Sequence, residues 1–178
     1  NAKIDHSDLG IEENVDYGDP GVKNIALFGV DTREENSFEG RSDTIMIASI
    51  NKSAHTVKLV SIMRDSYVPI DGHKSQKITH AYMFGGAQLA IKTINKNFGL
   101  NITDYATINF FKLASMIDSL GGIDVEITEK ERDYLNSHSM MTPEEAQYFP
   151  NPLSSGCVHL TGGQASWYAR IRYLDGDD

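Results

Sequence analysis

The sequence predicts an α/β fold, with a mixed central β-sheet sandwiched by helices. Short β-branched apolar runs and amphipathic stretches with helical spacing follow one another along the chain, without the regular rhythm of repeated βαβ units. Two of the runs are separated only by a polar connector of hairpin length, which indicates at least one antiparallel pair. With 178 residues, the chain is long enough to bury one hydrophobic core.

The first 22 residues differ in composition from the rest of the chain. They are acidic and interrupted by Gly and Pro, with no sustained periodicity. We therefore expect a flexible lead-in, the remnant of a linker, at 1–22 and one domain at 23–178. Because the chain begins with Asn1 rather than Met, we expect that a signal peptide or anchor could have been removed ahead of it.

The next part of the chain contains the apolar runs that are typical of strands. Each run is rich in β-branched residues, and polar or turn-forming residues bound it. The predicted strands are Lys23–Val30, Thr44–Ile50, Thr56–Ile62 and a short extended piece at Tyr67–Ile70.

Helical spacing dominates after this point. Apolar residues between Gly86 and Gly99 recur every three or four positions, and Gly99 is a typical C-terminal stop. Residues 128–158 are polar and contain three prolines, which predicts mostly loop with some helix. The remaining predicted elements are a strand at Tyr105–Phe110, a helix at Phe111–Leu120, a strand at Ile123–Ile127 and a helix at Gly162–Arg172 capped by Thr161.

The overall charge excludes one class of partner. The chain has 25 acidic and 16 basic residues, for a formal net charge of −9, which argues against general nucleic-acid binding. An anionic ligand is compatible with this charge only where cations are concentrated. Five of the six arginines do lie in a few short blocks, with only Arg132 outside them. The single cysteine, Cys157, excludes an internal disulfide and a cysteine-based metal site.

Acidic and basic side chains recur together at the predicted strand ends. The end of a strand is a common ligand-binding position in α/β sheets. Asp31 and Asp43 supply the hard oxygen ligands that Mg²⁺ prefers, and Arg33, Arg41 and Arg64 supply planar donors suited to phosphate. The alternative is that each pair forms an ordinary surface ion pair in a turn.

Other candidates carry weaker signals. Arg170 and Arg172 lie at the C-terminal end of the last predicted helix, where they either bind an anion or complement the helix dipole. The apolar faces of the helices at 87–98 and 113–120 are either core or the walls of a pocket for a long apolar ligand. His80, beside apolar residues, is more often structural than catalytic.

Taken together, the sequence blocks resemble the LytR-CpsA-Psr family of Gram-positive cell-wall enzymes from about Lys23 to the end. The blocks that carry the resemblance occur in the family's order: NIALFGVDTR, GRSDTIMIASIN, VKLVSIMRDSYVPI, KITHAYMFGG, INFFKLASMIDSLGGIDVEI and LTGGQASWYARIRYLDGDD. The family pattern continues into further arginines and a glutamine, whereas this sequence stops at Asp178. We therefore expect part of the phosphate site to be missing from this chain.

The resemblance implies a catalytic domain at 23–178 with a hydrophobic pocket for a polyprenyl chain. It implies Mg²⁺ at Asp31 and Asp43 and a role for Lys77 near the head group. The pyrophosphate would be bound by Arg33, Arg41, Arg64, Lys77, Arg170 and Arg172. The catalytic residues would be Asp31, Arg33, Arg64 and Asp178. Asp178 is one of three candidate bases, the others being Asp175 and Asp177.

The implied activity is a magnesium-dependent phosphotransferase. It would move an anionic glycopolymer, such as wall teichoic acid or capsule, from a polyprenyl-pyrophosphate carrier to peptidoglycan. An N-terminal anchor would hold the domain on the extracytoplasmic face of the membrane. Two alternatives stay open: a pyrophosphatase that hydrolyses such lipids, and a non-catalytic module that binds polyprenyl phosphate or glycan.

Overall fold

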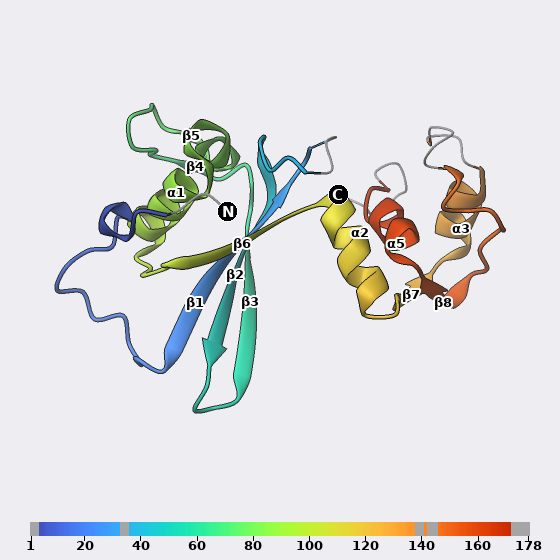
Figure 1. The fold of residues 1–178 in the computed structure, drawn as a ribbon, viewed down its shortest axis with the longest axis horizontal. Coiled ribbons are helices and arrows are strands. Elements are labelled where there is room, and N and C mark those ends of the chain that lie inside the picture. The colour runs from blue at the N-terminus through green and yellow to red at the C-terminus, as the bar shows by residue number, and fades with distance from the viewer. Residues whose placement is uncertain (1–3, 33–35, 138–140, 142–145, 172–178) are drawn as a thin grey trace. The chain divides into compact units, whose positions relative to one another are not determined.

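A computed structural model describes residues 4–32, 36–137, 141 and 146–171 (Figure 1). The chain divides into two compact units, residues 1–109 and 110–178, and each is described by itself. Mixed secondary structure with a central mixed sheet and flanking helices confirms the predicted α/β class.

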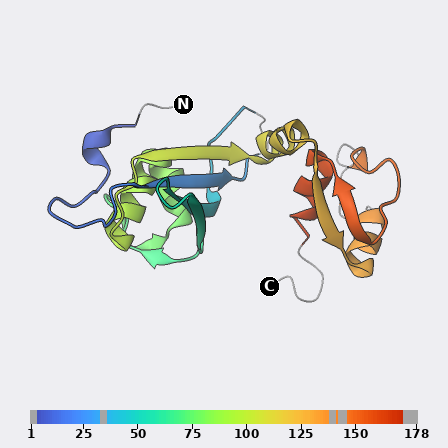
Figure 2. The ribbon, with the colours of Figure 1, turned by 90° about the horizontal axis from the view of Figure 1, so that it is seen from below.

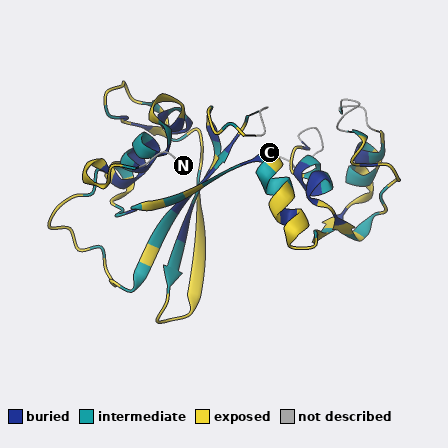
Figure 3. Ribbon diagram, viewed as in Figure 1, coloured by how far each residue is buried: buried dark blue, intermediate teal, exposed yellow. Residues whose placement is uncertain are grey.

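The first unit is built on a four-stranded sheet with the order β3-β2-β1-β6. Strands β1 to β3 pair antiparallel in chain order, whereas β6 pairs parallel with β1, and Figure 2 shows these two strands side by side. Figure 3 shows β3, at one edge, almost entirely exposed. The strands are β1 (Val22–Val30), β2 (Ser42–Asn51), β3 (Thr56–Ile62) and β6 (Asp104–Asn109), close to the predicted ranges.

Helix α1 (Thr79–Phe98) packs on this sheet. Its side chains Ile91 and Ile94 are fully buried in one cluster with Phe28 and Ile45 of the strands. Burying such apolar side chains is the main source of stability in a unit of this size. The prediction that this helical face forms core is therefore confirmed for its central residues.

The start of α1 differs from the prediction. The helix begins at Thr79 rather than after Gly86, and it is kinked where Gly85 and Gly86 leave helical backbone angles. Gly86 has φ 59° and ψ −154°, which side-chain-bearing residues rarely adopt. The C-terminal end of α1 agrees with the prediction, because Gly99 caps the helix in the left-handed conformation. Ahead of α1, β4 (Tyr67–Val68) and β5 (Gln76–Lys77) form a short ladder, shorter than the predicted extended piece.

Residues 4–11, which were expected in a flexible lead-in, pack against α1. Leu9 is only 1% exposed and belongs to the core cluster. Asn95 of α1 donates to the Leu9 carbonyl oxygen at 2.8 Å. Gln88 exchanges hydrogen bonds with the backbone of Asp5 at 2.9 Å. The segment, which includes the short 3-10 helix η1 (His6–Asp8), is therefore part of the first unit.

Where the structure describes it, the second unit consists of helices and a two-stranded antiparallel ladder. Thr161 caps the last helix through Gln164, as predicted, but that helix ends at Tyr168. Strand β8 (Gly156–Leu160) begins in the stretch 128–158, which was expected to be mostly loop, and pairs antiparallel with β7 (Ile123–Ile127). None of the helices described in the chain is long and apolar enough to cross a membrane. The elements are α2 (Phe110–Ser119), β7 (Ile123–Ile127), α3 (Glu129–Ser137), β8 (Gly156–Leu160) and α5 (Gly162–Tyr168).

Candidate functional site

Three strand ends and the start of α1 converge in the first unit. A bulge at Gly29–Val30 ends the regular pairing of β1 with β2. The backbone N–H of Asp31 then donates to the Arg41 carbonyl oxygen at 3.4 Å. Thr79 joins the other two ends, because its hydroxyl donates to the carbonyl oxygen of Ser42 at 3.0 Å and its N–H to that of Arg64 at 3.2 Å. The hydrogen-bonded backbone thus fixes where the neighbouring charged side chains begin.

These ends enclose a polar cavity of about 420 Å³, which we call the charged pocket. Five residues that sequence analysis selected line it together, although they come from separate segments of the chain. The lining residues are Asp31, Arg41, Asp43, Arg64, Asp65, Lys77, Thr79 and His80. The predicted convergence of polar strand ends is therefore present in the structure.

Four of the eight residues that line the charged pocket form ion pairs with one another. Arg64 Nη1 lies 2.9 Å from Asp43 Oδ1, and its Nε lies 4.0 Å from Asp65 Oδ2. Lys77 Nζ lies 2.6 Å from Asp65 Oδ1. The hydrogen bond from Lys77 holds the pKa of the Asp65 carboxyl below its ordinary value. The simple interpretation as surface ion pairs applies to these four side chains, which are all partly exposed.

Asp31 and Arg41 do not fit that interpretation. Within the described residues, neither side chain takes part in an ion pair. Both face the same cavity as the paired residues. A carboxylate and a guanidinium are thus left to interact with a ligand.

The chemistry of the carboxylates bears on the expected magnesium ion. Magnesium in phosphate-handling sites binds through one or two carboxylates, and substrate phosphates and water complete the octahedron. Asp31 and Asp43 both line the charged pocket and so bring two carboxylates to one cavity. No group of three or more potential ligating side chains occurs among the described residues, so a site made only of protein ligands is not present there.

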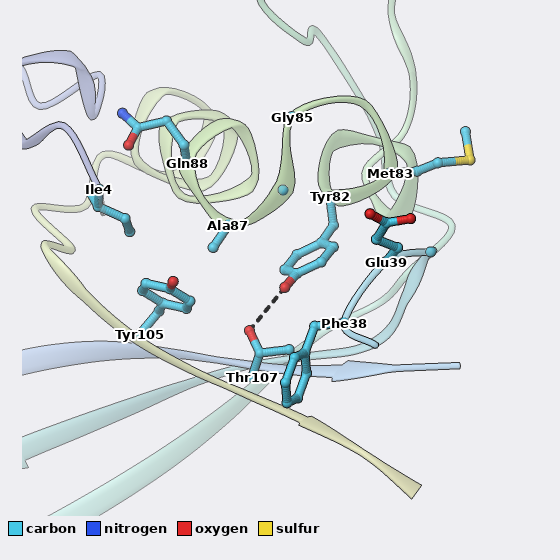
Figure 4. Close-up of a pocket in the computed structure, with 12 residues that line it drawn as sticks. Ile4, Phe38, Glu39, Tyr82, Met83, Gly85, Ala87, Gln88, Tyr105 and Thr107 are labelled. Carbon is cyan, nitrogen blue, oxygen red and sulfur yellow. Dashed lines mark hydrogen bonds between the residues drawn. The ribbon is translucent and has the colours of Figure 1, made fainter. Parts of the chain in front are cut away.

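A second cavity of about 600 Å³ lies between α1 and β6, and we call it the apolar pocket (Figure 4). Tyr82 of α1 points toward Thr107 of β6, and their hydroxyls are 3.1 Å apart. Tyr105 lies two residues before Thr107 on β6 and lines the same cavity. Burial raises the pKa of the Tyr82 hydroxyl. The lining residues are Ile4, Phe38, Glu39, Gly40, Tyr82, Met83, Gly85, Gly86, Ala87, Gln88, Tyr105 and Thr107.

The helix kink shapes this pocket. Both Gly85 and Gly86 are part of its wall, so the backbone itself faces the cavity there. Of the predicted apolar helix face at 87–98, only Ala87 lines the pocket, beside the polar side chain of Gln88. The two pockets are neighbours along the chain, because Gly40 lines the apolar pocket and Arg41 lines the charged pocket.

The other predicted site residues lie in the second unit or outside the described residues. Arg170 belongs to the second unit, where its guanidinium carbon lies 4.7 Å from the ring centre of Trp167 and 5.2 Å from that of Phe110. The others lie outside the described residues: Arg33, Arg172, Asp175, Asp177 and Asp178. Their assignment stays a prediction.

Sequence reasoning also missed pocket residues. Thr79, Tyr82 and Thr107 had no role before the structure placed them. The Gly85-Gly86 pair was the available signal, because adjacent glycines in an otherwise helical pattern indicate a kink that exposes the backbone.

The fold and its two pockets define a mixed α/β domain in which a charged pocket adjoins an apolar pocket along the chain. The model of the LytR_cpsA_psr family matches residues 2–178, and the chain belongs to this family.

Similar proteins have a consistent name. The chain is 32% identical over 174 residues to the polyisoprenyl-teichoic acid–peptidoglycan teichoic acid transferase TagU of Bacillus cereus (strain AH820), covering 97% of the chain and 51% of that protein. It is 35% identical over 153 residues to TagU of Enterococcus faecalis (strain ATCC 700802 / V583), covering 85% and 46%. The chain thus spans about half the length of these relatives.

Solved structures resemble the whole fold. One is the LytR-CPS2A-psr family protein YwtF (TagT) with bound octaprenyl pyrophosphate lipid, at a TM-score of 0.68 and 27% identity over 92% of this chain and 63% of that one. Another is TagT bound to LI-WTA, at a TM-score of 0.69 and 28% identity, covering 91% and 60%.

Proposed function

We propose that this chain is the catalytic part of a transferase that moves an anionic glycopolymer from a polyprenyl-pyrophosphate carrier to peptidoglycan. The names of the TagU relatives and the lipid bound to TagT support this activity. The observation that carries the proposal is that a charged pocket adjoins an apolar pocket along the chain. A polyprenyl pyrophosphate has the same two parts.

The basic residues of the charged pocket would hold the pyrophosphate. Arg41 and Arg64 offer planar donors for pairs of phosphate oxygens, and Lys77 adds a point charge. Because Asp43 already orients Arg64, little ordering of that side chain is needed when the phosphate binds. The prenyl chain would occupy the apolar pocket beside the Tyr82 ring.

Transfer then needs one in-line displacement at phosphorus. The oxygen of an acceptor hydroxyl on peptidoglycan bonds to the phosphorus that carries the glycopolymer, and the P–O bond to the polyprenyl phosphate breaks. The hydroxyl proton passes to a carboxylate. The candidate bases are Asp175, Asp177 and Asp178, which lie outside the described residues. Arg41 and Arg64 stabilise the charge that develops on the departing phosphate.

Asp31 and Asp43 are the residues that would hold a magnesium ion. When bound, the ion would neutralise phosphate oxygens and favour departure of the polyprenyl phosphate. We further propose that the domain works on the extracytoplasmic face of a Gram-positive membrane, held by an N-terminal anchor.

The test is transfer from a polyprenyl-pyrophosphate-linked glycopolymer to peptidoglycan by Asp31→Ala and Arg64→Ala variants of the full-length protein. We expect both to lose transfer while keeping the melting temperature, and EDTA to abolish transfer until Mg²⁺ is restored. Lys23→Ala is the matched control, because Lys23 and Arg64 are equally exposed, at 52% each, and each forms an ion pair.

The same assay separates the alternatives. Retained transfer in both variants would overturn the site assignment. Phosphate release that does not depend on peptidoglycan would favour a pyrophosphatase. Tight lipid binding without turnover would favour a binding module.

A further inference from the structure

A line of aromatic rings leads away from the charged pocket in the first unit. His80 is part of the pocket wall, and its ring centre lies 5.9 Å from that of Phe84, one helical turn further along α1. Phe84 in turn stacks on His73, with ring centres 4.2 Å apart and planes 13° from parallel. We call these three residues the aromatic ladder.

The aromatic ladder is not explained by the hydrophobic core. None of its rings belongs to the buried cluster of the first unit, and Phe84 is 38% exposed. His80, the ring of the aromatic ladder nearest the charged pocket, is held in place, because its Nδ1 shares a hydrogen bond of 2.8 Å with Oε1 of Gln76. Positioned and exposed aromatic rings next to a pocket are typical of a binding surface.

Tyr67 is a further exposed aromatic residue, on the β4–β5 ladder that carries Lys77. It is 74% exposed, and it lies directly opposite Lys77 in the β4–β5 ladder. Side chains directly opposite in an antiparallel pair project to the same face. Because Lys77 lines the charged pocket and reaches Asp65, Tyr67 lies on the pocket side of that ladder.

We propose that the aromatic ladder and Tyr67 form a subsite for a pyranose ring adjoining the phosphate. The proposal rests on the function proposed above, in which a sugar is attached to the bound phosphate and another sugar attacks it. The C–H face of a pyranose packs on the flat face of an aromatic ring, and its hydroxyls require nearby polar groups. Here the rings alternate with such groups, namely the nitrogens of His73 and His80 and the amide of Gln76.

Two sources supply a pyranose at this place. One is the first sugar of the glycopolymer on the donor lipid, and the other is the sugar of peptidoglycan that carries the acceptor hydroxyl. The chemistry of recognition is the same for both, so the kinetic test must vary the two substrates separately.

The test compares Phe84→Leu with Phe98→Leu in the full-length protein. Phe98 is the matched control, because it is 45% exposed at the other end of the same helix. For Phe84→Leu we expect a roughly fivefold higher KM for one glycan substrate with little change in kcat, since an aromatic contact contributes about 1 kcal/mol. The substrate whose KM rises identifies the source. Tyr67→Ala should raise the same KM.

A binding measurement keeps this test independent of the transfer reaction. Soluble glycan fragments without lipid or phosphate, titrated by NMR, should shift the signals of His73 and His80 in the wild type and in Phe98→Leu, but less in Phe84→Leu. If transfer fails but this binding persists, the subsite stands and the proposed function falls.

Two outcomes would overturn the subsite. One is identical KM values and identical glycan shifts in Phe84→Leu and Phe98→Leu. The other is unchanged glycan binding with loss of adsorption to phosphatidylglycerol vesicles in Phe84→Leu, which would make the ladder a membrane contact.

Discussion

The charged pocket and the apolar pocket lie in the same unit but differ in how they relate to its stability. The charged pocket is formed by partly exposed side chains whose ion pairs each contribute at most about 1 kcal/mol. The apolar pocket shares Tyr82 and Ala87 with the hydrophobic core. We infer that substitutions in the charged pocket change ligand binding and transfer but not the free energy of unfolding. Substitutions in the apolar pocket should change ligand binding and the free energy of unfolding together.

The largest expected effect follows from Arg41, which has no ion-pair partner among the described residues. Arg41→Ala should lower the transfer rate about 10²–10³-fold, the usual effect of removing one donor to developing charge. Arg41→Lys keeps the charge but loses the planar donor pair, so its transfer rate should lie between those of the wild type and Arg41→Ala. Unfolding free energy should change by less than about 0.5 kcal/mol in both.

Transfer assays and denaturant unfolding measure these two quantities, with Lys58→Ala on β3 as an exposed control in the same unit. A large loss of stability in Arg41→Ala would break the distinction between the pockets.

A second effect is expected at the helix kink. Gly86→Ala forces a side chain onto backbone angles that only glycine adopts readily, which should cost about 1–3 kcal/mol of unfolding free energy. Gly99→Ala is the comparison, because an ordinary left-handed cap costs roughly 1 kcal/mol. The two values come from urea unfolding. A cost at Gly86 no greater than at Gly99 would mean that the kink is not a fixed part of the apolar pocket.

The smallest effect concerns the protonation of Asp65. Its pKa lies below the ordinary value of 3.8, chiefly because Lys77 donates a hydrogen bond to it. A lowered carboxyl pKa means that the interaction is fully present above about pH 4 and is lost as the pH falls through the lowered pKa. Lys77→Ala should return the pKa toward 3.8.

An NMR titration of the Asp65 side-chain carbon measures this shift. Asp104 is the internal control, because Lys23 lowers its pKa and that pair is untouched by the substitution. An Asp65 pKa that stays low in Lys77→Ala would show that Arg64 dominates the charged pocket instead.

Most of the charged pocket could be predicted from the sequence, because each of its strand ends can be recognised from the residues next to it. Asp31, Asp43 and Arg64 each follow or precede a strand that is recognisable by itself, and antiparallel connection brings those strand ends together. Lys77 was different, since only the family resemblance selected it.

The apolar pocket could not be predicted in the same way. It depends on a kink within α1 and on a parallel strand pairing between distant segments, and neither leaves a periodic pattern. The burial of Leu9 and the strand β8 could not be predicted either, for related reasons. Leu9 is an isolated apolar residue in an acidic segment, and β8 lies beside prolines and becomes a strand through its pairing with β7.

The pairing of β1 with both a near and a distant strand has a consequence for folding. Strands β1 to β3 follow one another in sequence and can pair through short connections, whereas β6 must return across α1 to reach β1. Since closing long loops is slow, we expect the meander to form first and β6 to dock later. The strand ends that carry Asp31, Asp43 and Arg64 would then assemble before Tyr105 and Thr107 complete the wall of the apolar pocket.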